Sequence, residues 1–555
     1  MWSGSGSLPG DNTRQLNAVE PRDGPTAIHA VLPRLSSPAM LFPLRVSLRE
    51  WWQQPHRDIL SGLVVAFAMI PEAIAFSGIA GVDPRVGLFG AFALAVTLAV
   101  VGGRTALITS ATGSTALLMT GLVSQGEALG EGLGLQYLLA AGLLTGLLQI
   151  AWGYLRLAHQ MRFVPQPVMA GFVNALAILI LLAQLPQLGL DVFHPEKVVV
   201  QPSQLPAVWL LMALTLLLIY LLPRWTRAIP SALIAILITT GIAIGFRLDV
   251  PTVASLGSLP SGLPVLGLPA VPWDLNTLGI ILPTALAISL VGLMETFLTQ
   301  DILDDLTDQT SPKDVEARGQ GIGNIVSALF GGMPGCALVG QSVMNVGYGG
   351  RTRLSTLTSG VSLLAMILLA QEWVNRIPMA TLVGVMIMIA INTANLRSIT
   401  EIRRIPRSDT AVMVVTVVIT VLTHNLAIGL LSGVALAGIL FSRKVAKVIE
   451  VAAHREADDH RVYTVRGQLF FVSSIYFRQG FDVHEHPARV TIDMGDAHIW
   501  DQSGVAALDQ VIRRIKRGGS AVQVINLNPP SADLFARIGV AEEAGGRGGE
   551  PAPAH

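Results

Sequence analysis

Long apolar runs recur along most of this chain, from Ile59 to about Phe441, and short polar or Pro- and Gly-rich breaks separate them. Most of these runs are long enough to cross the roughly 30 Å of hydrocarbon in a bilayer as a helix. The composition agrees, because 51% of the residues are hydrophobic and only 13% are charged, well below the charged share of a soluble domain. The sequence therefore predicts a polytopic α-helical membrane protein.

Hydropathy and the breaks between the runs predict fourteen membrane spans. They lie near residues 59–78, 85–101, 107–123, 136–153, 165–185, 205–222, 229–246, 278–298, 318–331, 336–347, 354–371, 378–393, 409–425 and 427–446. The ninth and tenth are short and rich in Gly, so hydropathy alone does not define them.

The distribution of Arg and Lys predicts the orientation, because short loops that carry these residues stay on the cytoplasmic side. With the N-terminus inside, the inner loops hold thirteen such residues, and the outer loops hold only Arg85, Lys197, Arg247 and Arg376. This bias predicts an even number of spans in the plasma (inner) membrane, with both termini in the cytoplasm.

Fourteen spans divide into two halves of seven, and an odd number per half predicts that the second half is inverted. The third and tenth spans hold equivalent positions, and both begin with small residues, over 110–115 and 331–337. Interrupted segments at matching positions indicate a binding site near the middle of the membrane. Close helix packing is the alternative role of such small residues.

Helices that begin inside a membrane favour anions, because their first backbone N–H groups lack partners and the helix dipole adds positive potential. Two facing helix starts therefore predict an oxyanion site without a buried Lys or Arg. The hydroxyl groups of Thr112, Ser114 and Thr115 add further donors. The residues predicted to bind the anion are Glu72, Ala111, Thr112, Gly113, Ser114, Gly335, Cys336, Ala337 and Leu338.

Two carboxylates lie inside predicted spans, where ionisable groups are costly and usually functional. Glu72 follows Pro71 in the first span, and Glu295 lies near the end of the eighth. Beside an anion site, a carboxylate can hold a proton or a Na⁺ ion that offsets the charge of the anion. Thr296 and Thr299 add oxygen atoms near Glu295. A structural hydrogen bond or an interfacial position is the alternative for either carboxylate.

The charge balance and the absent motifs argue against other classes of protein. Lys plus Arg equals Asp plus Glu at 37 each, so no excess charge indicates a nucleic-acid partner. No G-x-x-x-x-G-K-[ST] motif indicates ATP-driven transport, and no set of catalytic residues indicates an enzyme. Cys336 is the only cysteine, which excludes a disulfide framework and a multi-cysteine metal site.

The character of the chain changes after Lys447, where strand and helix patterns alternate. They predict a strand pair over 461–475, strands over 489–494 and 520–526, and an amphipathic helix over 503–516. The predicted segments are a disordered cytoplasmic tail (1–45), a transmembrane transporter domain (46–447), a cytoplasmic α/β domain (448–545) and a second disordered tail (546–555).

Motifs from about Asp58 to about Val540 resemble the SulP family of anion transporters. They are Ile70-Pro71-Glu72-Ala73, Gly81-Val82-Asp83-Pro84, Ala111-Thr112-Gly113, Gly319-Gln320-Gly321-Ile322-Gly323-Asn324, Phe330-Gly331-Gly332-Met333-Pro334-Gly335, Gly349-Gly350-Arg351-Thr352 and, in the tail, Asp501-Gln502-Ser503-Gly504-Val505. The resemblance implies a seven-plus-seven inverted repeat, with a core domain of spans 1–4 and 8–11 and a gate domain of spans 5–7 and 12–14. It also implies an elevator movement of the core, a homodimer and a C-terminal STAS domain.

The resemblance further implies roles for single residues. Bicarbonate carriers of this family place Na⁺ around an acidic residue on span eight, which implies cation coupling through Glu295, Thr299, Ala337 and Val339, with Glu295 and Thr299 as the Na⁺ ligands. Val339 replaces a hydroxyl of those carriers, which favours H⁺, and Glu72 stands where many sulfate-transporting members carry Gln. Ser503 matches a phosphorylatable, regulatory position of STAS relatives, with a helix-start cap as the alternative.

The sequence thus predicts a secondary active transporter of sulfate or bicarbonate, coupled to Na⁺ or H⁺ and surrounded by membrane lipid. No cofactor other than bound Na⁺ is expected. Two alternatives stay open: uncoupled anion exchange or a channel-like conductance on the same fold, and an anion sensor that signals through its tail domain without transport.

Overall fold

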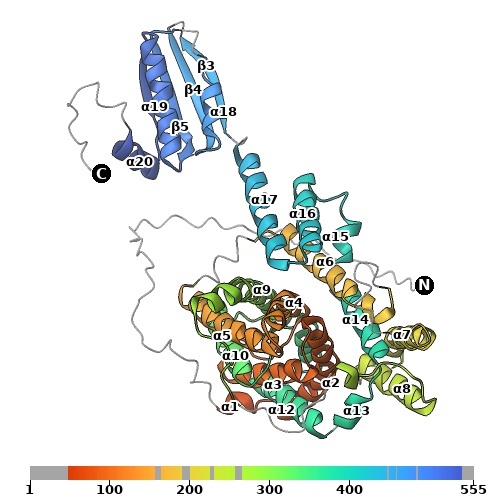
Figure 1. Ribbon diagram of the computed structural model, residues 1–555. Helices are drawn as coiled ribbons and strands as arrows, with labels where there is room; N and C mark the ends of the chain where they lie inside the picture. Colours follow the sequence, from red (N-terminus) through yellow and green to blue (C-terminus); the bar gives the residue numbers. More distant parts are fainter. Residues whose placement is uncertain are drawn as a thin grey trace, which may run out of the picture. The chain divides into compact units, whose positions relative to one another are not determined.

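The computed structural model describes residues 48–156, 164–190, 200–225, 230–256, 266–369, 371–446, 449–457, 459–482 and 486–539. The predicted disordered tails, 1–45 and 546–555, lie outside these residues. The described part before residue 447 is almost entirely helical, and the part after it combines strands and helices (Figure 1).

The helices before residue 447 pack as two groups, which we call the core group and the gate group (Figure 1). The core group comprises α2 (Pro55–Ala80), α3 (Pro84–Val101), α4 (Gly113–Leu129), α5 (Leu133–Tyr154), α9 (Leu275–Thr307), α10 (Lys313–Leu329), α11 (Val339–Gly347) and α12 (Arg353–Leu369). The gate group comprises α6 (Gln166–Leu182), α7 (Leu205–Leu221), α8 (Ser231–Gly245), α14 (Met379–Thr393), α16 (Arg407–Thr423) and α17 (Leu426–Ala446). Short helical segments are α1 (Leu48–Trp51), η3 (Leu185–Leu188), η5 (Leu222–Arg224), η6 (Val253–Leu256), α13 (Gln371–Asn375) and α15 (Leu396–Thr400).

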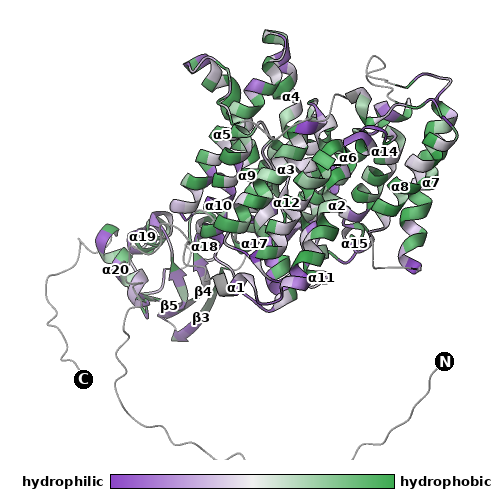
Figure 2. Cartoon of the chain, turned by 90° about the horizontal axis from the view of Figure 1, so that it is seen from below, coloured by the Kyte–Doolittle hydropathy of each residue, from purple (hydrophilic) through white to green (hydrophobic). Residues whose placement is uncertain are grey.

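Each of the fourteen predicted spans overlaps one of these core or gate helices. Among the described residues, seven helices are long and apolar enough to cross a membrane by length and composition, and Figure 2 shows the hydrophobic residues that dominate them. The count of fourteen crossings stays a prediction. The ninth predicted segment begins too late, because the first turn of α10 is polar and hydropathy overlooks it.

Helix contacts repeat between the two halves of the chain. Helix α2 packs on α4 and α12, among others, and its counterpart α9 packs on the equivalent helices α11 and α5. In the gate group, α6 packs on α16 and α17, while its counterpart α14 packs on α7 and α8. A shift by seven spans relates these pairs, which supports the predicted inverted repeat.

Local sequence explains where several of these helices begin. Asp83 caps α3 by accepting a hydrogen bond from the backbone N–H of Arg85, and Pro84 follows at the first helical position. Asp274 caps α9 by accepting from the N–H of Thr277 at 2.7 Å, and this bond lowers the pKa of the Asp274 carboxyl. These two helices therefore start at Asp residues that the preceding loops supply.

The C-terminal part folds around a four-stranded sheet in the order β3-β4-β5-β6. Its elements are β3 (Glu450–Ala457), β4 (His460–Leu469), α18 (Ser474–Gln479), β5 (Arg489–Ile499), α19 (Gln502–Arg517), β6 (Ala521–Ile525) and α20 (Pro529–Ile538). Strand β3 is antiparallel to β4, and the other pairs are parallel. The apolar face of α19 is buried in the core of this sheet domain, with Leu508 and Ile512 among its members.

The predicted strand pair over 461–475 is wrong. This region supplies the single strand β4 and then turns into α18. The antiparallel partner of β4 is β3, which the prediction missed. Most residues of β3 are exposed, so this edge strand lacks the alternation of apolar and polar residues on which the prediction depended.

Candidate functional site

The starts of α4 and α11 lie side by side because two short strands in front of them pair. Strand β1 (Thr109–Ser110) and strand β2 (Cys336–Ala337) are antiparallel, with Ser110 opposite Cys336. The backbone N–H of Leu338 also donates to the carbonyl of Ile108 at 2.9 Å. Both helices begin within three residues of this pair, so segments more than 220 residues apart meet at one place.

Steric contacts explain why two positions in this arrangement are glycine. A Cβ atom at Gly335 would overlap the carbonyl oxygen of Ser110, so only glycine allows this close approach of the two strands. A Cβ atom at Gly113 would lie 3.0 Å from the ring of Phe76 and 3.1 Å from Ile180, which come from the core and gate groups. In contrast, a Cβ at Gly340 in the first turn of α11 would meet no atom within 4 Å. The start of α11 therefore borders open space.

A network of hydroxyl groups covers the start of α4. Thr112 is its N-cap and accepts from the backbone N–H of Thr115, and the two side chains form a capping box. The Thr112 hydroxyl also lies 2.9 Å from the Ser114 hydroxyl and 3.2 Å from the Cys336 sulfur. All four side chains are buried. Of the residues predicted to bind the anion, Thr112, Ser114 and Cys336 thus lie together within a network of their own hydrogen bonds.

The Glu295 carboxylate lies at the same point. Its Oε2 atom accepts a hydrogen bond from the Ser114 hydroxyl and another from the Cys336 thiol at 3.1 Å. Ser114 and Cys336 are both 0% exposed, and Glu295 is partly buried. A carboxylate on α9 is therefore held by one donor from α4 and one from β2.

Two threonines of α9 next to Glu295 link its backbone and strand β2 to the predicted cation site. The Thr299 hydroxyl donates its proton to the Glu295 carbonyl at 2.7 Å. The lone pairs of the Thr299 hydroxyl oxygen therefore stay available to a cation. The Thr296 hydroxyl accepts from the N–H of Ala337 at 3.2 Å. Leu338 and Val339 have apolar side chains, so only their backbone carbonyls can bind a cation. These oxygen donors fit Na⁺ chemically, with a carboxylate and hydroxyls as its preferred ligands.

Glu72, the second predicted carboxylate, contacts the other half-helix. It is buried in α2, directly after Pro71, and its Oε1 atom accepts a hydrogen bond from the Gln341 side chain in the first turn of α11. The two carboxylates therefore contact the starts of different half-helices.

Two buried amides of α10 support the strand pair, and sequence reasoning missed the contact made by one of them, Gln320. Asn324 of α10 donates to Gln149 of α5 at 2.8 Å and accepts from the N–H of Gly335 at 2.8 Å. One turn earlier on α10, the Gln320 amide donates to the Thr109 hydroxyl at 2.9 Å. The spacing of Gln320 and Asn324 places them on one helix face, which is the signal that could have identified Gln320.

A buried ionic cluster joins the loop after α3 to α9 and α10. Arg104 forms an ion pair with Asp304 at 2.6 Å, and the Glu316 carboxylate accepts from the N–H groups of Gly103 and Arg104 at 2.7 and 3.0 Å. Sequence reasoning used Arg104 only to orient the chain. The structure gives it a second role in holding these helices together.

Ser503 does not cap a helix. The N-cap of α19 is Asp501, which accepts from the N–H of Gly504 at 2.9 Å and from that of Phe471 at 2.9 Å. Ser503 lies in the first turn of α19, and its side chain is exposed. The alternative of a helix-start cap is therefore wrong, because an aspartate two residues earlier takes that position.

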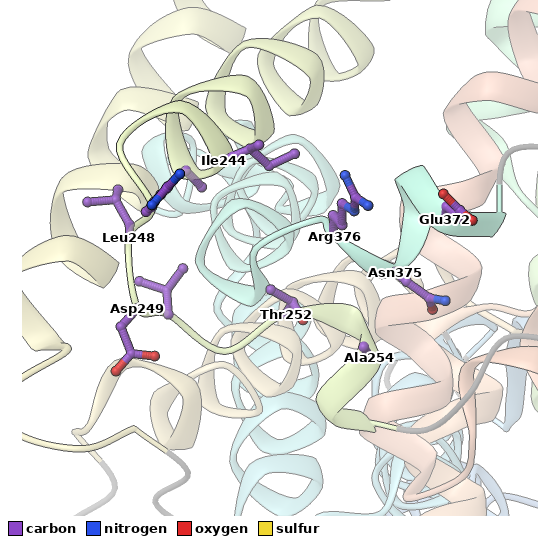
Figure 3. A pocket seen from close by; sticks show the side chains of 11 residues that line it. Ile244, Leu248, Asp249, Thr252, Ala254, Glu372, Asn375 and Arg376 are labelled. Carbon is purple, nitrogen blue, oxygen red and sulfur yellow. The ribbon is translucent and has the colours of Figure 1, made fainter.

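A separate hollow of about 650 Å³ lies at the end of α8 (Figure 3). It is lined by residues of α8, of the segment after α8, of η6, and of α13 with the residue that follows it. The charged residues among them are Arg247, Asp249, Glu372 and Arg376. Its lining contains none of the residues predicted to bind the anion. The hollow is thus distinct from the site at α4 and α11.

Comparison with known proteins agrees with this architecture. Residues 56–416 match the sulfate permease family, and residues 452–546 match the STAS domain. YbaR of Bacillus subtilis (strain 168), named as a proposed sulfate transporter, is 43% identical over 490 residues, which cover 88% of this chain and 98% of YbaR. The bicarbonate transporter BicA of Synechocystis sp. is 27% identical over 500 residues, covering 84% of this chain and 87% of BicA.

Solved structures show the same fold. The transmembrane domain of a cyanobacterial bicarbonate transporter BicA matches 69% of this chain and 98% of its own, with 28% identity and a TM-score of 0.60. The murine anion transporter Slc26a9 in the inward-facing state matches 92% of this chain and 93% of its own, with 18% identity and a TM-score of 0.78.

Proposed function

Because this chain belongs to the sulfate permease family, we propose that it is a secondary active transporter of sulfate or bicarbonate, driven by co-transported Na⁺ or H⁺. The chain is a multi-pass membrane protein of a transporter family rather than an enzyme. One observation carries the proposal. At the paired starts of α4 and α11, Ser114 and Cys336 already hold a carboxylate, which is an oxyanion group.

The helix starts supply the attraction for the anion. The first N–H groups of α4 and α11 have no partners inside their helices, and each helix dipole adds positive potential at the same place. The hydroxyl of Ser114 and the thiol of Cys336 add side-chain donors. Open space beside Gly340 provides room for a small anion at the start of α11.

Glu295 is the proposed coupling residue, because its negative charge lies where an anion would bind. A cation held there offsets the charge of the anion. If the cation is Na⁺, Glu295 and Thr299 are its ligands, together with carbonyls of Ala337 to Val339. If the cation is H⁺, it binds to the Glu295 carboxylate itself.

The contact between the core and gate groups favours an elevator movement. The groups meet where α2 packs on α14 and α8, α4 on α6, and α9 on α17. Around Gly113 this contact is apolar, with Phe76, Leu176, Ile180 and Met386 in one cluster. Apolar side chains can slide past one another without leaving buried polar groups unpaired.

We assign the transporter to the plasma (inner) membrane with both termini in the cytoplasm, and propose that it acts as a homodimer. Uptake of labelled sulfate and bicarbonate into proteoliposomes tests the function, with and without a Na⁺ or pH gradient. We expect accumulation that follows one gradient and that Glu295→Gln abolishes. Equal uptake without a gradient would indicate exchange or conductance, and binding without uptake would indicate a sensor. Either result overturns the proposal.

A further inference from the structure

The donors predicted to bind the substrate already have an occupant. Ser114 and Cys336 both donate to the Oε2 atom of Glu295. Both donors are completely buried, and neither lies on the helix that carries Glu295. A substrate oxygen and the Glu295 oxygen therefore compete for the same two hydrogen bonds.

The chemistry of the two ligands is closely matched. A carboxylate presents two oxygens on a planar carbon and shares one negative charge between them, as bicarbonate does. Its attraction to the start of α4 has the same origin, which is the unpaired N–H groups and the helix dipole. Because Glu295 is tethered to α9, its effective concentration at the site is in the mM range or above. A free anion has to compete with that concentration.

We propose that the Glu295 carboxylate is a tethered anion that occupies the substrate's hydrogen-bond donors, Ser114 and Cys336, and that cation binding to Glu295 frees them. This inference rests on the proposed function and deepens it, because it explains how the two ions are coupled. The cation draws the carboxylate from the donors, so cation binding precedes anion binding. Without a cation, the carboxylate keeps the anion out.

The inference makes an unusual prediction about affinity. If Glu295 were a ligand that helps to bind the anion, its removal would weaken anion binding. A tethered competitor has the opposite effect, because the site is available to the anion only in the fraction of molecules whose donors are free. When the donors are free in about 10% of the molecules or fewer, removal of the competing carboxylate strengthens the apparent affinity for the anion by about tenfold or more.

Equilibrium binding of labelled sulfate and bicarbonate to the purified full-length protein tests this inference. In choline buffer without Na⁺, we expect Glu295→Gln to bind anion at least about tenfold more tightly than the unmodified protein. The matched control is Glu127→Gln, which removes one negative charge at the other end of α4, where Glu127 accepts from the N–H groups of Gly132 and Gly134. This control is expected to bind as the unmodified protein does.

A second variant keeps the negative charge and still tests the inference if Glu295→Gln fails to fold. Glu295→Asp shortens the side chain by one methylene and withdraws the carboxylate from Ser114 and Cys336. We expect it to bind anion more tightly than the unmodified protein in choline buffer. Unchanged or weaker binding in folded Glu295→Gln or Glu295→Asp overturns the inference. Gradient-driven uptake is measured separately, so loss of the proposed function is distinguishable from loss of this competition.

Discussion

Ser114 and Glu295 join opposite halves of the membrane domain by a hydrogen bond at the start of α4. Gln341 and Glu72 form the corresponding bond at the start of α11, with the halves exchanged. Each half thus provides a carboxylate for the half-helix of the other. The two sites differ in their donors, because Glu295 accepts from a hydroxyl and a thiol, whereas Glu72 accepts from an amide.

Gln341→Leu is expected to destabilise the protein, because it leaves the buried Glu72 carboxylate without its donor. The loss of a buried partner costs roughly 1–3 kcal/mol, and more for a charged group. Thermal unfolding in detergent measures the loss. The double variant Glu72→Leu with Gln341→Leu removes both polar groups and is expected to recover much of the stability. No recovery would contradict the assigned pairing.

Gly340→Ala is expected to weaken anion binding without destabilising the fold. Its methyl group would project into open space at the start of α11, where we place the anion, and alanine stabilises a helix by about 0.5–1 kcal/mol relative to glycine. Gly347→Ala is the matched control, because it lies at the other end of α11 and also meets no atom within 4 Å. Equal anion affinity in the two variants would show that the anion does not bind beside Gly340.

Gly335→Ala is expected to disrupt the paired strands. The added Cβ overlaps the Ser110 carbonyl, so the backbone has to shift, and overpacking of this kind typically costs about 1–3 kcal/mol. We expect a lower melting temperature and loss of anion binding together. Gly340→Ala is the comparison, because we expect it to weaken anion binding and leave the melting temperature unchanged. A Gly335→Ala protein of unchanged stability would disprove the close approach of β1 and β2.

Asp501→Ala is expected to loosen the start of α19, because Asp501 accepts from the N–H groups of Gly504 and Phe471. Loss of an N-cap costs about 1 kcal/mol. Hydrogen exchange of the full-length protein should show faster exchange in the first turn of α19. Ser503→Ala should leave that exchange unchanged, because the Ser503 side chain is exposed and is not the cap. Faster exchange in Ser503→Ala and unchanged exchange in Asp501→Ala would show that Ser503 is the cap.

The sequence predicted the helices well where one physical signal dominates. Apolar runs mark the core and gate helices, and the small residues before Gly113 and Val339 mark the two helix starts. Hydropathy carries no information on which buried polar groups meet, because that depends on the packing of distant helices. Gln149 and Gln320 were missed for this reason, since their partners Asn324 and Thr109 lie on other elements. The roles predicted for Glu72, Glu295 and Thr299 stay predictions, although the structure places the two carboxylates beside the predicted helix starts.

In the C-terminal sheet domain, the sequence predicted the buried elements and missed an exposed one. Its buried strand β5 and helix α19 follow the apolar pattern, and they were predicted near their observed positions. The edge strand β3 was missed because most of its residues are exposed, so its sequence lacks the alternation of apolar and polar residues that marks a core-facing strand. Asp501 was not identified as the cap, because the family resemblance drew attention to Ser503 two residues later.

The two-residue strand pair also has a mechanical consequence. A ladder of backbone hydrogen bonds cannot slip by a fraction of its spacing, which is about 3.3 Å per residue, without breaking every bond in it. The paired strands therefore hold the starts of α4 and α11 together as one unit. In the elevator movement proposed above, the two helix starts would therefore move together along the apolar contact with the gate group, and an anion bound between them would not be released by separation of the two helices.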